Sequence, residues 1–139
     1  MDFPTTNIGG IEISRLVIGS NMFCGASHFS LARDKWLRRH FTRERILEMV
    51  QFCAERGLNA MVAGASEQYM SILRDAEKAT GRHVHYIATP AGVTIEELKK
   101  GIDLAADLGC ELCWPHSTFT DSALNVQKGI IEGAPEVLD

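Results

Sequence analysis

Residues 58–90 read LNAMVAGASEQYMSILRDAEKATGRHVHYIATP, and this stretch contains a complete strand–helix–strand unit. Residues 58–65 and 84–88 are short apolar runs of the length of a buried strand. The segment between them carries apolar side chains at helical spacing, namely Tyr69, Ile72, Leu73 and Ala76. Gly81 lies where a residue of left-handed conformation ends a helix. The stretch therefore predicts two parallel strands joined by a helix that packs on the sheet.

The same unit occurs upstream of this stretch. Residues 16–19 form an apolar run, and Thr42 is a suitable N-cap for the helix that follows. The apolar positions of that helix again have helical spacing: Ile46, Leu47, Val50, Cys53 and Ala54. Gly57 is placed to end the helix. The connection before it is long, and residues 28–41 (HFSLARDKWLRRHF) suggest either a lid over a site for an anionic substrate or an extra surface helix with a basic face.

The unit occurs once more downstream. Thr94 and Glu97 have the S/T-x-x-E spacing of a capping box and predict the start of a helix. We expect this helix to bury Ile95, Leu98, Ile102 and Ala105. Gly109 is placed to end it, and residues 110–114 form the next apolar run.

Strands that alternate with helices predict a parallel sheet covered by helices, as in a doubly wound sheet or a (β/α)8 TIM barrel. Residues 19–25 (GSNMFCG) lack the G-x-G-x-x-G pattern, which argues against a Rossmann nucleotide site. Four strands and three helices amount to half of a (β/α)8 barrel, whose usual length is about 250 residues. We therefore expect residues 1–139 to be a single domain that forms the first half of such a barrel.

The last residues support this expectation. Residues 129–139 read GIIEGAPEVLD, and Pro135 is suited to the first turn of another helix. The sequence thus predicts a chain that continues beyond Asp139. Alternatively, a second copy covers the two open edges of the sheet in a homo-oligomer.

Charge and composition exclude several classes of protein. The formal net charge is −4, with acidic and basic residues interspersed, which argues against nucleic acid as a partner. We find neither a signal peptide nor an apolar stretch of about 20 residues that could span a membrane. The cysteines at 24, 53, 110 and 113 fit no small disulfide framework, so we expect a cytoplasmic protein. Cys110 and Cys113 have C-x-x-C spacing, but on a strand they would face opposite sides and could not share a metal.

Four stretches resemble the N-terminal half of aldo-keto reductases, in the same order. Residues 10–25 (GIEISRLVIGSNMFCG) are similar to the opening β-hairpin and first strand of that family. Residues 54–73 and 83–90 resemble its second and third strands with their loops. Residues 104–121 (LAADLGCELCWPHSTFTD) resemble its fourth strand, which ends in a histidine. The resemblance implies a (β/α)8 barrel that reduces a small-molecule carbonyl substrate with NADP(H), whose binding residues lie mostly in the second half of the barrel.

The resemblance also implies which positions carry the chemistry. Family members use a tetrad of Asp, Tyr, Lys and His, and only the histidine has a counterpart here, at His116. The Asp position falls on Val62 and the Lys position on Pro90, and neither residue can carry charge or transfer a proton. The spacing of Tyr69 places it on the core face of its helix rather than in the site.

Independently of the resemblance, the active site of such a barrel lies at the C-terminal ends of the strands. His116 follows the fourth run and is the first candidate for proton transfer. Asp121 could orient it, or could simply be a turn residue, and Glu67 could act as a base or merely begin a helix. We predict that the substrate is bound by Asn21, His28, Trp114 and Ser117.

Three hypotheses about function remain open at this point. The first is a divergent oxidoreductase that uses NADP(H). The second is a lyase, isomerase or hydrolase that uses acid–base chemistry or a divalent metal held by His116, Glu67, Asp121 and His28. The third is a non-catalytic barrel or half-barrel. His83 and His85 lie at the opposite end of their strand, and we interpret them as structural.

Overall fold

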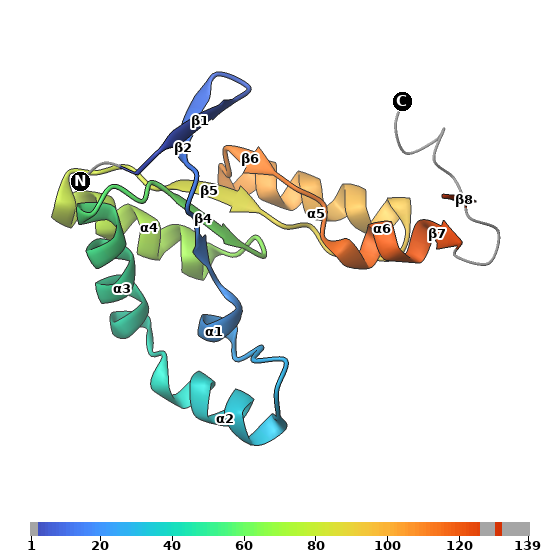
Figure 1. The fold of residues 1–139 in the computed structure, drawn as a ribbon, viewed down its shortest axis with the longest axis horizontal. Coiled ribbons are helices and arrows are strands. Elements are labelled where there is room, and N and C mark those ends of the chain that lie inside the picture. Colours follow the sequence, from blue (N-terminus) through green and yellow to red (C-terminus); the bar gives the residue numbers. More distant parts are fainter. Residues whose placement is uncertain (1–2, 126–129, 132–139) are drawn as a thin grey trace.

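The computed structural model describes residues 3–125 and 130–131, and within them a mixed α/β fold with a parallel sheet of four strands (Figure 1). The strands are β3 (Ile18–Gly19), β4 (Ala60–Ala63), β5 (His85–Ala88) and β6 (Leu112–Cys113). They pair in the order of the sequence, with Ile18 opposite Met61 and Ile87 opposite Leu112. The predicted parallel sheet is therefore confirmed. The order does not reverse within these strands, as it would in a doubly wound sheet, and closure into a barrel stays a prediction.

Two helices cover one face of this sheet. Helix α3 (Arg43–Glu55) is capped by Thr42 and helix α4 (Glu67–Thr80) by Ser66, whose side chains each accept a hydrogen bond from the first turn. Their apolar faces meet the sheet in one core cluster that includes Ile46, Val50, Ala54, Met61, Ile72, Leu73, Ala76 and Tyr86. Both predicted helices and their buried faces are confirmed.

The third predicted helix forms but is less buried than expected. Helix α5 (Ile95–Leu108) begins with the predicted capping box of Thr94 and Glu97. Ala105 is buried, whereas Ile95 and Ile102 remain 37% and 39% exposed. The prediction that both isoleucines are buried is wrong, because α5 extends away from the sheet instead of lying across it (Figure 1).

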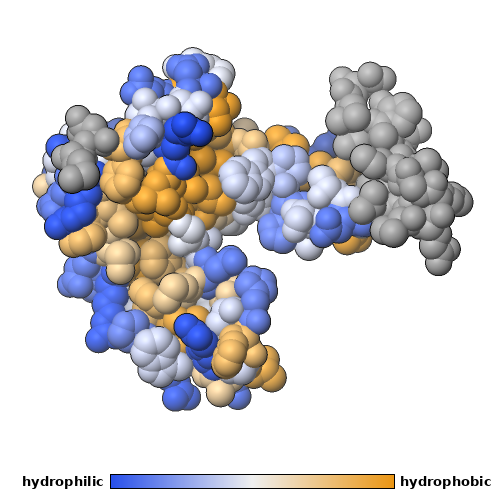
Figure 2. Space-filling model, viewed as in Figure 1, coloured by the Kyte–Doolittle hydropathy of each residue, from blue (hydrophilic) through white to orange (hydrophobic). Residues whose placement is uncertain are grey.

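The opposite face of the sheet carries a smaller apolar cluster. Ala60 and Ile87 are buried there under Ile13, which belongs to a hairpin of β1 (Thr5–Ile8) and β2 (Ile11–Ser14). The buried Ser14 amide donates to the side-chain oxygen of Asn59, which ties the hairpin to the start of β4. Apolar residues gather over β4 and β5 in the space-filling view (Figure 2). The hairpin that the resemblance implied is thus present and lies at the N-terminal end of the strands.

The long first connection contains two helices, α1 (Asn21–Cys24) and α2 (Leu31–His40). Leu37 is buried, while Leu31 on the same helix is 79% exposed. Arg38 donates from Nε to the carbonyl oxygen of Cys24, 3.3 Å away, and so holds α2 to α1. The interpretation of residues 28–41 as an extra surface helix is confirmed for residues 31–40.

After β6 the chain forms α6 (Ser117–Ala123) and a short antiparallel pair, β7 (Leu124–Asn125) with β8 (Ile130–Ile131). Asp121 lies within α6, so its interpretation as a turn residue is wrong. The hydroxyl of Thr120 donates to the carbonyl oxygen of Ser117 within this helix. These residues therefore belong to a helix and not to a loop. The helix predicted from Pro135 lies outside the described residues.

Candidate functional site

The C-terminal ends of the parallel strands border an open cavity of about 560 Å³. The lining residues are Gly19, Ser20, Asn21, Met22, Val62, Thr89, Trp114, His116 and Ser117. They come from the ends of the four strands and the segments that follow them, including the first residues of α1 and α6. Figure 2 shows the molecule hollowed between the parts that carry α2 and α6. Four of the predicted site residues, Asn21, Trp114, His116 and Ser117, thus line one cavity.

His116 is positioned by backbone pairing that continues past the ends of the strands. The Trp114 amide donates to the carbonyl oxygen of Ala88, and the His116 amide donates to that of Pro90, both at 2.9 Å. This pairing extends the β5–β6 ladder to the point where the chain turns into α6. The imidazole is therefore carried on a backbone that the sheet itself fixes.

The ring of His116 has a defined tautomer when it is neutral. The amide of Thr118 lies 3.2 Å from Nδ1, and the Thr118 hydroxyl lies at the same distance. An amide N–H can only donate, so Nδ1 must be the accepting nitrogen of the ring. The proton of the neutral ring is then on Nε2, which can donate to a substrate oxygen.

Asn21 and His28 form a second polar group beside the cavity. The side-chain amide nitrogen of Asn21 lies 3.3 Å from Nε2 of His28. His28 adopts a left-handed backbone conformation with φ of 54°, which is uncommon for a residue other than glycine. The contact connects His28 to the cavity through Asn21, although His28 is not one of the lining residues.

The two predicted carboxylates do not join this group. Glu67 is on the exposed first turn of α4 and lies 3.8 Å from Arg74 in an ion pair. Asp121 is exposed on α6, and the ring of His116 is bonded by Thr118 instead. The structure therefore does not gather His116, Glu67, Asp121 and His28 into a metal site. Within the described residues, the one group of such ligands close enough to share a metal ion is His83, His85 and Glu111.

The remaining tetrad positions carry no proton donor in the cavity. Val62 lines the cavity wall, and Pro90 is buried and is not among the lining residues. Tyr69 packs against the core cluster, where burial raises the pKa of its hydroxyl to about 12. The predicted core position of Tyr69 is confirmed, so of the four tetrad positions only His116 brings a proton-transfer group to the cavity.

The two thiols near β6 are poorly suited to chemistry. Burial raises the pKa of Cys110 to about 11, and it raises the pKa of Cys113 as well. A thiol that stays protonated is a weak nucleophile and a weak metal ligand. Only Cys113 lies on β6 (Leu112–Cys113), and Cys110 precedes the strand, so the prediction that both cysteines lie on one strand is wrong.

The sequence did not identify every group at the site. Thr118 is the residue that orients His116, a role that we had considered for Asp121. The sequence offered a local indication of this contact, since a polar side chain often bonds the backbone two residues away. Ser20 also lines the cavity, and it directly precedes the predicted Asn21.

Comparison of the chain with models of protein families gave no match, and comparison with curated proteins gave none either. No helix among the described residues has both the length and the apolar character needed to cross a membrane. The functional argument therefore rests on the cavity and its residues.

Proposed function

We propose that this chain is part of a cytoplasmic small-molecule enzyme of the (β/α)8 class and that the strand-end cavity is its active site. In this proposal His116 donates a hydrogen bond from Nε2 to the carbonyl oxygen of a small substrate. As the resemblance to aldo-keto reductases implies, NADPH would supply the hydride, and the resulting alkoxide would take its proton from water in the open cavity. The observation that carries the proposal is the bond from the Thr118 amide to Nδ1, which directs the proton of the neutral ring to Nε2.

The lining of the cavity supports a small polar substrate without a large charge. Ser20, Asn21 and Ser117 offer neutral hydrogen-bonding groups, while Met22 and Val62 add an apolar wall. Such a mixture of apolar surface and a few polar groups is typical of small-molecule sites. Trp114, which is 53% exposed, offers a flat surface on which a planar group could stack.

A second candidate is an acid–base lyase, isomerase or hydrolase on the same scaffold. The observation that favours it is the presence of Val62 and Pro90 where the family has charged residues. His116 would then move the proton itself, and no hydride donor would be needed. The two candidates share the cavity and differ in their need for NADPH.

The experiment is to express the protein from its full reading frame and to incubate it with a fixed panel of aldehydes and ketones, with and without NADPH. We expect NADPH consumption with at least one compound and a loss of about 100-fold or more in His116→Gln, because general acid–base groups contribute about 10²–10⁴-fold. His40→Gln is the matched control, since His40 lies outside the cavity lining. Turnover that needs His116 but not NADPH would select the second candidate. A rate that His116→Gln leaves unchanged would contradict both.

A further inference from the structure

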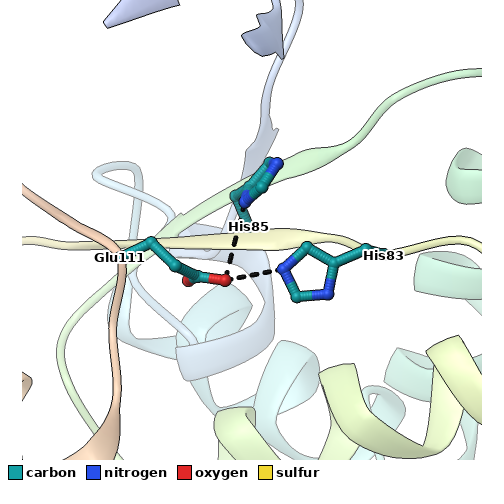
Figure 3. A group of neighbouring side chains, drawn as sticks. All are labelled: His83, His85 and Glu111. Carbon is teal, nitrogen blue, oxygen red and sulfur yellow. Dashed lines mark hydrogen bonds and ion pairs between the residues drawn. The ribbon is translucent and has the colours of Figure 1, made fainter. Parts of the chain in front are cut away.

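Three potential metal ligands meet at the N-terminal end of the sheet, away from the strand-end cavity. His83 and His85 are two residues apart in the extended segment that leads into β5, so their side chains lie on the same side of it. Glu111 directly precedes β6, the neighbouring strand. Figure 3 shows its carboxylate facing both imidazoles, and one ligand atom from each residue lies within 4.8 Å of the others.

The individual distances suit a shared ion after small side-chain rotations. Oε1 of Glu111 lies 2.6 Å from Nε2 of His83 and 3.5 Å from Nδ1 of His85. In a tetrahedral zinc site with bonds near 2.0–2.1 Å, two ligand atoms are about 3.3 Å apart. The first pair would have to separate slightly, and the second is already close to this distance.

The surroundings already orient two of the three ligands. Oε2 of Glu77 lies 3.0 Å from Nδ1 of His83, which leaves Nε2 directed at Glu111. A carboxylate bonded to the outer nitrogen of a histidine is the usual support for a metal-binding imidazole. The Tyr86 amide donates to Oε2 of Glu111 at 2.9 Å and leaves Oε1 for the ion.

An ion pair between His85 and Glu111 does not by itself explain the surroundings of the His85 ring. Its Nδ1 atom is shielded from solvent and has no hydrogen-bond partner, although Glu111 is near. A buried polar atom without a partner is costly, and native structures usually satisfy such atoms. A metal ion between His85 and Glu111 would satisfy it.

We propose that His83, His85 and Glu111 bind one divalent transition-metal ion, of the class of Zn²⁺, which clamps β5 to β6 at the end of the sheet opposite His116. Two imidazoles and one carboxylate form a ligand set that suits zinc and its neighbours better than Mg²⁺ or Ca²⁺. The ion takes the place of the proton that His83 shares with Glu111, and this proton is released to solvent. The proposal is independent of the proposed enzymatic function.

The test is a calorimetric titration of the metal-free chain with Zn²⁺, in a buffer that does not chelate the metal and with reduced thiols. We expect one ion to bind, and we expect His85→Gln and Glu111→Gln each to weaken binding at least about tenfold, because they remove a ligand. Glu77→Gln should weaken it by about 10–100-fold, the usual effect of losing a supporting carboxylate. Circular dichroism checks that each variant is folded.

Two controls separate this site from other ligands in the chain. The double variant Cys110→Ser/Cys113→Ser should bind Zn²⁺ as the wild type does, and so should His116→Gln. Undetectable binding by the wild type would overturn the proposal, as would unchanged binding in folded His85→Gln. Binding that disappears in the double cysteine variant would overturn it too, because the thiols would then be the ligands. None of these outcomes bears on the activity assigned to His116.

Discussion

The amide of His116 donates to the carbonyl oxygen of Pro90 at 2.9 Å, so Pro90 holds the candidate catalytic histidine through its backbone. The resemblance to aldo-keto reductases would place a lysine at this position. Proline cannot supply charge to the site, but its carbonyl group is available for this bond. Pro90 is also close to Gly101 of α5, where an added Cβ would lie 2.8 Å from the proline Cβ. Pro90 therefore has a structural role, and His116 lines the cavity beside neutral polar groups.

The hydroxyl of Tyr86 links β5 to the turn between β4 and α4. It donates to the carbonyl oxygen of Gly64 at 2.5 Å and accepts from the amide of Ser66 at 3.2 Å. We expect Tyr86→Phe to lower the free energy of unfolding by about 1–2 kcal/mol, because two backbone groups lose their partner. Urea denaturation measures the change. Tyr69→Phe is the control and should change stability less, so equal losses in both variants would contradict this role.

Leu37 is the side chain that docks α2 onto the rest of the protein. It is 1% exposed, whereas Leu31 on the same helix is 79% exposed. Leu37→Ala should cost about 2–5 kcal/mol, because it leaves a cavity under the helix. Leu31→Ala should stay within about 0.5 kcal/mol of the wild type. Thermal or urea unfolding compares the two. Similar effects would show that α2 is not packed as described.

Gly25 ends α1 in a place that only glycine fits. Its φ is 72°, and an added Cβ would lie 2.5 Å from Cγ of Arg38 and 2.8 Å from the carbonyl oxygen of Asp34. Gly25→Ala should therefore destabilise the protein by more than the roughly 1–2 kcal/mol of left-handed strain alone. Gly81→Ala is the matched control, since Gly81 has φ of 66° and open space around it. If unfolding experiments give the same loss for both, the contact with Arg38 has no cost.

Arg43 and Asp75 join α3 to α4, and their bond makes stability depend on pH. The hydrogen bond from Arg43 holds the pKa of Asp75 below its ordinary value of 3.8. The folded state thus favours the ionised carboxylate. This contribution is complete above the pKa of the unfolded chain and is lost as the pH falls through the lower pKa of the folded one.

The measurement is the melting temperature of the wild type and of Asp75→Asn at neutral pH and at pH values below 3.8. We expect the variant to be less stable at neutral pH and the difference to shrink in acid. Other carboxylates titrate in both proteins and cancel in the comparison. A difference that stays constant in acid would contradict the assignment.

The sequence predicted the elements better than their packing. The capping box at Thr94, the cap at Thr42 and the helical spacing of Ile72 and Leu73 are local, and all appear in the structure. Burial of Ile95 was predicted wrongly, because helical periodicity defines a face but does not identify the element that covers it. The four-stranded sheet was predictable because the strand–helix unit repeats along the sequence. Closure of this sheet into a barrel stays a prediction, because it would depend on contacts with strands outside residues 1–139.

The residues around the candidate site were also predicted better than the contacts of their side chains. The rule that parallel strands end at a common edge brought Asn21, Trp114, His116 and Ser117 together correctly. It could not indicate that Thr118 orients the ring of His116, because that depends on side-chain geometry within one turn. The group of His83, His85 and Glu111 joins two strands and was missed, although the alternation of the two histidines was visible in the sequence.

The most direct test of the central claim is to titrate the isotope-labelled chain with a fixed set of small aldehydes, ketones and hydroxy acids and to follow its amides by NMR. Our account predicts that at least one compound shifts the amides of Asn21, Thr89 and His116 and that His116→Ala weakens this binding, while His40→Ala does not. Shifts confined to residues away from the cavity, or shifts that His116→Ala leaves unchanged, would contradict the assignment of the strand-end cavity as the active site.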